Sequence, residues 1–354
     1  MAGSRIIKKH RTKTQVHHRA VVEENDIQPM ALQPAFDYFV SAKIAEGCRE
    51  RTYTDYSNTW RYFTDWLKEV RMNSVYIHEI TPEMIRRYIH YITTDAPRFK
   101  GHPLIQNKDK KGLATATINM RIRGLKTTFN FWVREGFLKR SPADNIKIQK
   151  DDEDKIESFT DEQINELLGA CDQRSYVGFR DYVFQMLLFD TGMRMNEALS
   201  IRRQDVDMKT RCIELAAQFN KNRKSRLIPL SHQVVKLLHE LIEENRTHFP
   251  EADKVFLSCF GEELRDTQMN KRLKYYGDVT GVGKEIRTTA HTWRHTFART
   301  SILNGMDIFS LQRILGHSSL QMVRRYVQMT GTDVKIQHDK FSPVNRLRTK
   351  LTKR

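Results

Sequence analysis

The chain has 354 residues, 39% of them hydrophobic, and 60 Lys and Arg against 43 Asp and Glu give it a formal net charge of +17. Its length is typical of two domains, each large enough for its own core. No apolar run is long enough to cross a bilayer, and the N-terminus lacks the apolar segment of a secretion signal. No lipidation motif or basic amphipathic helix indicates a membrane surface, so the charge favours nucleic acid as the partner.

The positive charge is concentrated at both ends of the chain. Residues 1–22 contain six Lys or Arg and no acidic residue, and residues 335–354 contain seven against one Asp. Terminal runs of this kind often contact phosphates. We therefore predict a basic N-terminal arm over residues 1–30 and a basic C-terminal tail over residues 333–354. A purely solubilising role for these ends is the alternative.

The spacing of the cysteines indicates the cellular compartment in which the protein is expected. Cys48, Cys171, Cys212 and Cys259 are scattered and fit neither a zinc-binding spacing nor a disulfide framework. A reducing cytoplasm is therefore expected.

Four helical patterns follow the arm and predict an all-α domain over residues 31–145. They cover residues 34–47, 51–70, 80–94 and 116–137. In the first pattern Phe36, Phe39, Val40 and Ile44 recur at helical spacing and are expected to face the core. The basic, Gly- and Pro-containing segment 98–112 predicts an exposed insertion that faces DNA.

A linker over residues 146–158 precedes the second domain, which we expect over residues 159–332. The acidic run Asp151–Asp154 is interpreted as a solvated hinge, because adjacent side chains do not converge on one metal ion. Thr160 and Gln163 then form a capping-box pattern that predicts the start of a helix.

One β signal interrupts the helical patterns of the second domain. Residues 211–217 and 225–231 are short β-rich runs on either side of the polar segment QFNKNRK, which predicts a hairpin or a small sheet. The later segments, residues 232–246, 267–279, 289–305, 307–317 and 319–329, again have helical periodicity.

Several common catalytic motifs are absent from the sequence. It contains no GxxxxGK[ST], GxGxxG, HExxH or GxSxG motif, so ATP-driven, dinucleotide-dependent and zincin chemistry have no support. His291 and His295 in HTWRH have a spacing that zinc ligands use, but the Glu of zincins and a third ligand are missing. We expect neither a metal nor a cofactor.

Polar residues of the second domain have a chemical logic as a set. They are Arg194 after Gly192, Lys221 and Lys224 in the hairpin turn, His291 and Arg294 in HTWRH, and His317 followed by Tyr326. Each one alone is more often a core or surface residue. Together, two arginines can bind a phosphodiester, a tyrosine can attack it, histidines can handle the proton and a lysine can protonate the leaving oxygen.

Four segments carry a resemblance to the tyrosine recombinases, the family of phage and mobile-element integrases and Xer enzymes. In chain order they are TGMRMNEAL, KNRKSRLIPL, HTWRHTFA and LGHSSLQMVRRY, within residues 160–330. The resemblance implies that Arg194, Arg294 and His317 contact the scissile phosphate, and that His291 assists proton removal from the nucleophile Tyr326. Lys221 is the implied general acid, with Lys224 as the alternative. Trp293 stands where the family often has an aliphatic residue.

The resemblance also implies a fold and an activity. The expected fold is mainly α, with a four-helix core-binding (SAM-like) domain and an α-rich catalytic domain with a small β-sheet or hairpin, forming a C-shaped clamp on DNA. The activity implied is ATP-independent, metal-independent recombination through a 3′-phosphotyrosyl intermediate, integrating or excising a mobile element. The partners implied are double-stranded recombination sites and three further protomers at synapsis. Accessory DNA-bending or directionality proteins and a nucleoid location are compatible with it.

Two supporting residues and two alternative functions complete these expectations. Glu197 is expected to orient the helix that begins at Arg194, and His295 to support His291 and Arg294 from behind. A type IB topoisomerase-like enzyme would share the chemistry on one duplex. A DNA-binding protein that has lost catalysis is disfavoured because all six catalytic candidates are present.

Overall fold

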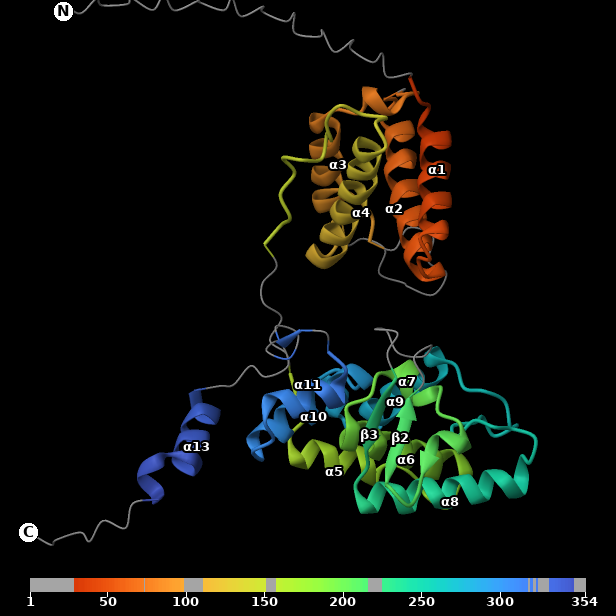
Figure 1. Ribbon diagram of the computed structural model, residues 1–354, viewed down its shortest axis with the longest axis vertical. Coiled ribbons are helices and arrows are strands. Elements are labelled where there is room, and N and C mark those ends of the chain that lie inside the picture. Colours follow the sequence, from red (N-terminus) through yellow and green to blue (C-terminus); the bar gives the residue numbers. More distant parts are fainter. Residues whose placement is uncertain are drawn as a thin grey trace, which may run out of the picture. The chain divides into compact units, whose positions relative to one another are not determined.

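The chain forms two compact units, residues 1–153 and 154–354. The computed structural model describes residues 29–72, 74–98, 111–150, 157–215, 225–317, 319–320, 323 and 331–346. Within these ranges no helix combines the length and apolar character needed to cross a membrane. Figure 1 shows the helices and strands of each unit.

The first unit is a group of four helices, as the periodicity predicts. They are α1 (Leu32–Ala45), α2 (Glu50–Glu69), α3 (Pro82–Thr94) and α4 (Thr115–Arg134), with a short 3₁₀ helix η1 (Ile77–Glu79). Helix α4 packs against each of the other three. Thr81 caps α3 by accepting a hydrogen bond from the backbone N–H of Met84 at 3.3 Å.

The core of the first unit is aromatic, and it corrects one predicted core position. Ile44 is 52% exposed, whereas the neighbouring Lys43 is 8% exposed. The Lys43 ammonium lies 5.3 Å from the centre of the Phe131 ring and pairs with Glu46. A lysine can place its aliphatic stem over aromatic rings and keep its charge paired, so periodicity alone chose the wrong side chain.

The second unit is mainly helical and contains one small sheet. Its helices are α5 (Asp161–Gly169), α6 (Tyr176–Thr191), α7 (Met195–Leu199), α8 (His232–His248), α9 (Asp266–Thr280), α10 (Ala290–Leu303), α11 (Ile308–Leu315) and α13 (Gly331–Phe341), with the 3₁₀ helices η2 (Arg203–Asp205), η3 (Val282–Lys284) and η4 (Pro343–Arg346). Thr160 and Gln163 form the predicted capping box at the start of α5. The mainly α fold class with a small sheet is confirmed.

The sheet has three antiparallel strands in the order β1–β2–β3. These are β1 (Val206–Asp207), β2 (Cys212–Leu215) and β3 (Arg226–Pro229), and Ile213 pairs with Ile228. The predicted pairing of two strands is confirmed. The sequence did not reveal β1, because two residues are too few to show an alternating pattern.

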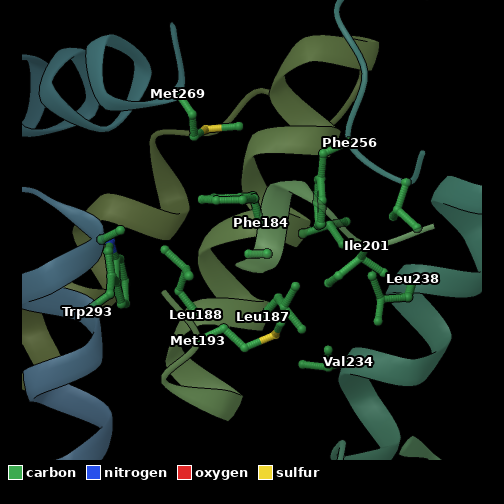
Figure 2. Close-up of a cluster of buried hydrophobic side chains, with 14 of the residues drawn as sticks. Phe184, Leu187, Leu188, Met193, Ile201, Val234, Leu238, Phe256, Met269 and Trp293 are labelled. Atoms are coloured by element: carbon green, nitrogen blue, oxygen red, sulfur yellow. The ribbon is translucent and has the colours of Figure 1, made fainter. Parts of the chain in front are cut away.

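Helix α6 was missed because it is buried on every side. Val183, Phe184, Leu187 and Leu188 are fully buried, and the polar residues Arg180, Asp181 and Gln185 of the same helix are buried as well. A helix surrounded by protein has no amphipathic stripe to detect. Figure 2 shows Phe184, Leu187 and Leu188 beside labelled residues of other segments: Met193, Ile201, Val234, Leu238, Phe256, Met269 and Trp293.

The C-terminal segment contains a helix where the charge pattern predicted only a basic tail. Helix α13 covers Gly331–Phe341, and the side-chain amide of Gln337 donates a hydrogen bond to the carbonyl of Leu303 at 2.7 Å. Several predicted features lie outside the described residues: the arm before residue 29, residues 99–110, the Asp151–Asp154 run, the turn with Lys221 and Lys224, and Tyr326.

Candidate active site

The turn after α6 places Arg194. Gly192 ends the helix with φ of +60°, and a Cβ at this position would overlap the side chains of Phe297 and Leu315. Glycine is therefore required both by the left-handed backbone and by the close packing. Arg194 follows this turn as the residue that precedes helix α7.

Glu197 holds Arg194 in place. Its carboxylate accepts hydrogen bonds from the Arg194 backbone N–H at 3.0 Å and from Arg194 Nη1 at 2.7 Å. Arg226 of β3 also donates to this carboxylate, through Nη2 at 2.8 Å. Burial alone would raise the pKa of Glu197, but Arg226 and Arg194 hold it below its ordinary value. Glu197 thus stays charged and caps α7, in the way expected of a residue that orients this helix.

Backbone carbonyls at the C-terminal ends of two helices hold the Arg294 side chain. It lies on α10 and is 2% exposed. Its Nη1 donates to the carbonyl of Gly192 at 2.6 Å, and its Nη2 donates to the carbonyl of Leu315 at 2.9 Å. Carbonyls at helix C-termini lack partners within the helix and carry partial negative charge, so they can hold a buried guanidinium.

His317 follows helix α11 through another left-handed glycine, Gly316, with φ of +65°. It is 6% exposed, and its Nε2 lies 2.6 Å from Arg294 Nη2. A guanidinium can only donate, so Nε2 must accept and a neutral ring carries its proton on Nδ1. Burial, reinforced by Arg294 and Arg194, lowers the pKa of His317 to about 3. The ring is therefore neutral near pH 7.

His291 and His295 lie one turn apart on α10, whose position confirms the predicted helix. Their ring centres are 4.2 Å apart with the planes at 78°. His291 is exposed, whereas His295 and Arg294 are buried, so the three do not share one solvent-facing surface. Trp293, at the position where the family often has an aliphatic residue, is fully buried, and its ring packs edge-on against Phe159.

The structure brings Arg194, Arg294 and His317 together: Arg294 contacts His317, and Arg194 shares the Glu197 carboxylate with Arg226, which lies against Gly316 next to His317. His291 lies on the same helix as Arg294, and the remaining candidates, Lys221 and Tyr326, lie outside the described residues. Arg226 is the charged residue that the sequence reasoning missed. No sequence pattern indicated this contact, because Arg226 and Glu197 are 29 residues apart. The described residues contain no cluster of three or more His, Cys, Asp or Glu side chains that could hold a metal.

Comparisons of the sequence identify relatives of both units. Residues 157–332 match the phage integrase family, and residues 32–148 match the phage integrase SAM-like domain. Tyrosine recombinase XerC of Chlamydia caviae is 27% identical over 312 residues, which are 87% of this chain and 96% of that protein. Tyrosine recombinase XerD of Staphylococcus haemolyticus is 28% identical over 236 residues, covering 66% of this chain and 78% of the relative.

Solved structures share the fold at lower sequence identity. The Tn1549 transposon integrase in complex with transposon right end DNA superposes with a TM-score of 0.66 at 19% identity, covering 88% of this chain and 99% of that one. The XerH recombinase bound to its difH substrate gives a TM-score of 0.61 at 21% identity, covering 85% and 82%. With both units matched and the relatives spanning most of the chain, this protein belongs to the tyrosine recombinase family and is a site-specific recombinase.

Proposed function

We propose that this recombinase cuts and rejoins duplex DNA through Tyr326. The phenolic oxygen attacks the phosphorus of a phosphodiester, a 3′-phosphotyrosyl bond forms, and the bond to the 5′ oxygen breaks. The 5′-hydroxyl of a partner strand then attacks the phosphotyrosine and releases the enzyme. One phosphoester replaces another at each step, so no ATP is required.

The hydrogen bonds that hold Arg294 and Arg194 in place are the observation that best supports this chemistry. The carbonyls of Gly192 and Leu315 orient Arg294, and the Glu197 carboxylate orients Arg194. Preorganised guanidinium groups can bind the non-bridging oxygens of a phosphate and stabilise the charge of its pentacoordinate transition state. In this proposal His317 donates to the same phosphate through Nδ1–H, because Nε2 already accepts from Arg294.

The proton transfers are assigned to His291 and Lys221. In this proposal His291 receives the phenolic proton, directly or through water, because it is exposed at the first turn of α10 while Arg294 and His295 are buried behind it. Lys221 gives a proton to the leaving 5′ oxygen, with Lys224 as the alternative. His295 supports His291 through the contact between their rings.

The proposed partners are duplex recombination sites and three further copies of the chain. The net charge of +17 supports extended phosphate contacts. Helix α13 carries exposed apolar side chains, among them Val334 and Phe341 at 54% and 56% exposure, which support docking of this helix onto a neighbouring protomer. The likeness to a transposon integrase supports integration or excision of a mobile element as the biological role.

Covalent capture of DNA tests the proposed chemistry and finds the target site in the same experiment. Genomic DNA that includes the sequence around the gene is nicked lightly, because a nick near the cleavage point lets the short 5′-hydroxyl strand diffuse away. Detergent-resistant adducts are then sequenced. We expect the wild type, but not Tyr326→Phe, to capture one site beside the gene. Adducts with Tyr326→Phe would disprove the nucleophile, and a captured site far from the gene would count against the mobile-element role.

A plasmid assay separates recombination from other outcomes. A supercoiled plasmid with two copies of the captured site should be resolved into two circles. Relaxation without resolution would instead indicate a topoisomerase. Crosslinking on the captured duplex should give a four-protomer complex, and a largest species with two protomers would contradict the tetramer.

A further inference from the structure

Arg226 makes a forked contact with the carboxylate that holds Arg194. Its Nη2 lies 2.8 Å from Glu197 Oε2 and its Nη1 lies 3.5 Å from Oε1. The Arg226 and Glu197 side chains are 8% and 2% exposed. The same two oxygens accept hydrogen bonds from the backbone and side chain of Arg194, so Arg226 and Arg194 share one carboxylate.

The Arg226 guanidinium also lies against the turn that carries His317. Helix α11 packs against β3, and a Cβ at Gly316 would overlap Arg226 Nη1. Gly316 therefore serves two requirements, a left-handed backbone with φ of +65° and room for the guanidinium. The next residue is His317, whose Nε2 accepts from Arg294.

We propose that Arg226 is a positioning residue for DNA cleavage, which sets the spacing between Arg194 on one side and the His317–Arg294 pair on the other. Arg226 acts through the Glu197 carboxylate and through the turn at Gly316. In this arrangement the phosphate would bind to Arg194, Arg294 and His317. The inference rests on the proposed function, because it assumes that these three side chains hold the scissile phosphate.

The expected effect follows from geometry. Without Arg226, Glu197 loses its forked partner and the Gly316 turn loses the group against which it packs. Displacements of about 1 Å in groups that hold a reacting phosphate can slow a reaction about 10²-fold. Duplex binding should change little, because it is spread over many phosphate contacts.

The test compares Arg226→Gln with Arg226→Lys on the nicked duplex captured by the wild type. Single-turnover adduct formation is measured at saturating protein, and the dissociation constant is measured by gel shift. Arg226→Gln should form the adduct about 10²-fold more slowly with the dissociation constant nearly unchanged. Arg226→Lys keeps the charge but not the fork, so it should remain about tenfold slow. A wild-type rate in either folded variant would overturn the proposal.

Arg180 provides a matched control. It is a buried arginine that pairs with Asp181 at 2.6 Å, with side-chain exposures of 4% and 1%, early in helix α6. Arg180→Gln should lower the unfolding temperature and leave the adduct rate of the folded protein unchanged. Arg272→Gln, which removes a less buried partner of Asp181, replaces it if Arg180→Gln does not fold. Equal slowing by a control and by Arg226→Gln would reduce Arg226 to a stability role.

A double variant tests the route through Glu197. If Arg226 acts through this carboxylate, Arg226→Gln combined with Glu197→Gln should be no slower than the slower single variant. Multiplying effects would overturn that route. Failure of the wild type to form any adduct would remove the proposed function and this inference together. A normal wild type with a normal Arg226→Gln variant would remove the inference alone.

Discussion

The second unit contains two buried clusters of arginine and carboxylate that differ in how their charge is arranged. The Asp181 cluster consists of Arg180, Asp181, Arg272 and Tyr276, and the Glu197 cluster consists of Arg194, Glu197, Arg226, Arg294 and His317. The first has two arginines for one carboxylate, and the second has three. The Glu197 cluster therefore carries the larger positive surplus, and its His317 is neutral.

The donors of the two clusters also point to different partners. In the Asp181 cluster, Arg180 donates to the carbonyl of Leu257 and Arg272 donates to the hydroxyl of Tyr276. Burial and the Asp181 charge raise the pKa of Tyr276, which makes its phenol a poor nucleophile. One arginine of each cluster is partly exposed, Arg194 at 25% in the Glu197 cluster and Arg272 at 34% in the Asp181 cluster. The two clusters are therefore distinguished by the positive surplus, which is larger around Glu197, and by the His317 imidazole that the Glu197 cluster contains.

Removal of Arg294 should have the largest effect, and a small effect would contradict the contrast between the Glu197 and Asp181 clusters. Arg294→Ala should slow covalent adduct formation by about 10³-fold or more, because it removes a preorganised group that stabilises the transition state. Duplex binding in a gel shift should persist, and Arg272→Ala serves as the control. Parallel loss of binding and cleavage would show that Arg294 acts in binding instead of catalysis.

Replacement of the hairpin lysines sharpens the assignment of the general acid. Lys221→Ala should slow cleavage of normal DNA by about 10²- to 10⁴-fold, whereas Lys224→Ala should have a small effect. A substrate with sulfur in place of the leaving 5′ oxygen should restore the rate of Lys221→Ala, since a thiolate leaves without protonation. Rescue of Lys224→Ala and not of Lys221→Ala would reverse the assignment.

Asp181→Asn should affect stability and not chemistry. Removal of the charge leaves the buried Arg180 and the partly exposed Arg272 without their carboxylate, and the free energy of unfolding should fall by about 3 kcal/mol. Urea unfolding measures the loss, and adduct formation below the transition should match the wild type. A slowed adduct rate in the folded variant would mean that the two clusters are coupled.

The neutral state of His317 predicts a pH dependence of stability. Its pKa is about 3 in the folded protein, below the unfolded value of about 6.5, so the unfolded chain binds more protons between these values. Stability is therefore fully present above pH 6.5 and falls as the pH is lowered towards 3. Arg294, Arg194, Arg226 and Glu197 act on the ring throughout this window.

The check compares the wild type with His317→Gln. Between pH 7.5 and 5 the wild type should lose up to about 2 kcal/mol of unfolding free energy more than the variant. Carboxylates with lowered pKa, such as Glu197, lose their contribution only at lower pH, so the two effects separate. Parallel pH profiles would show that His317 is protonated in the folded protein.

The sequence alone determined the helices that have one apolar face and the identity of the chemical groups. Thr160 begins the helix that its capping pattern predicts, because a cap depends on residues three positions away. Helix α6 escaped prediction because burial on every side removes the periodic signal. Lys43 is buried in place of the predicted Ile44, because the aliphatic stem of a lysine can pack on aromatic rings.

Only the tertiary structure decided how the candidate site is held. The carbonyls that grip Arg294 belong to Gly192 and Leu315, which are 102 and 21 residues away in the chain. Every residue has a backbone carbonyl, so no sequence pattern marks these two as partners. Arg226 reaches the Glu197 carboxylate from 29 residues away, and this side-chain contact depends on where strand β3 packs and not on local spacing. The sequence supplied the reacting groups, and the packing of helix ends and strand β3 determined their positions.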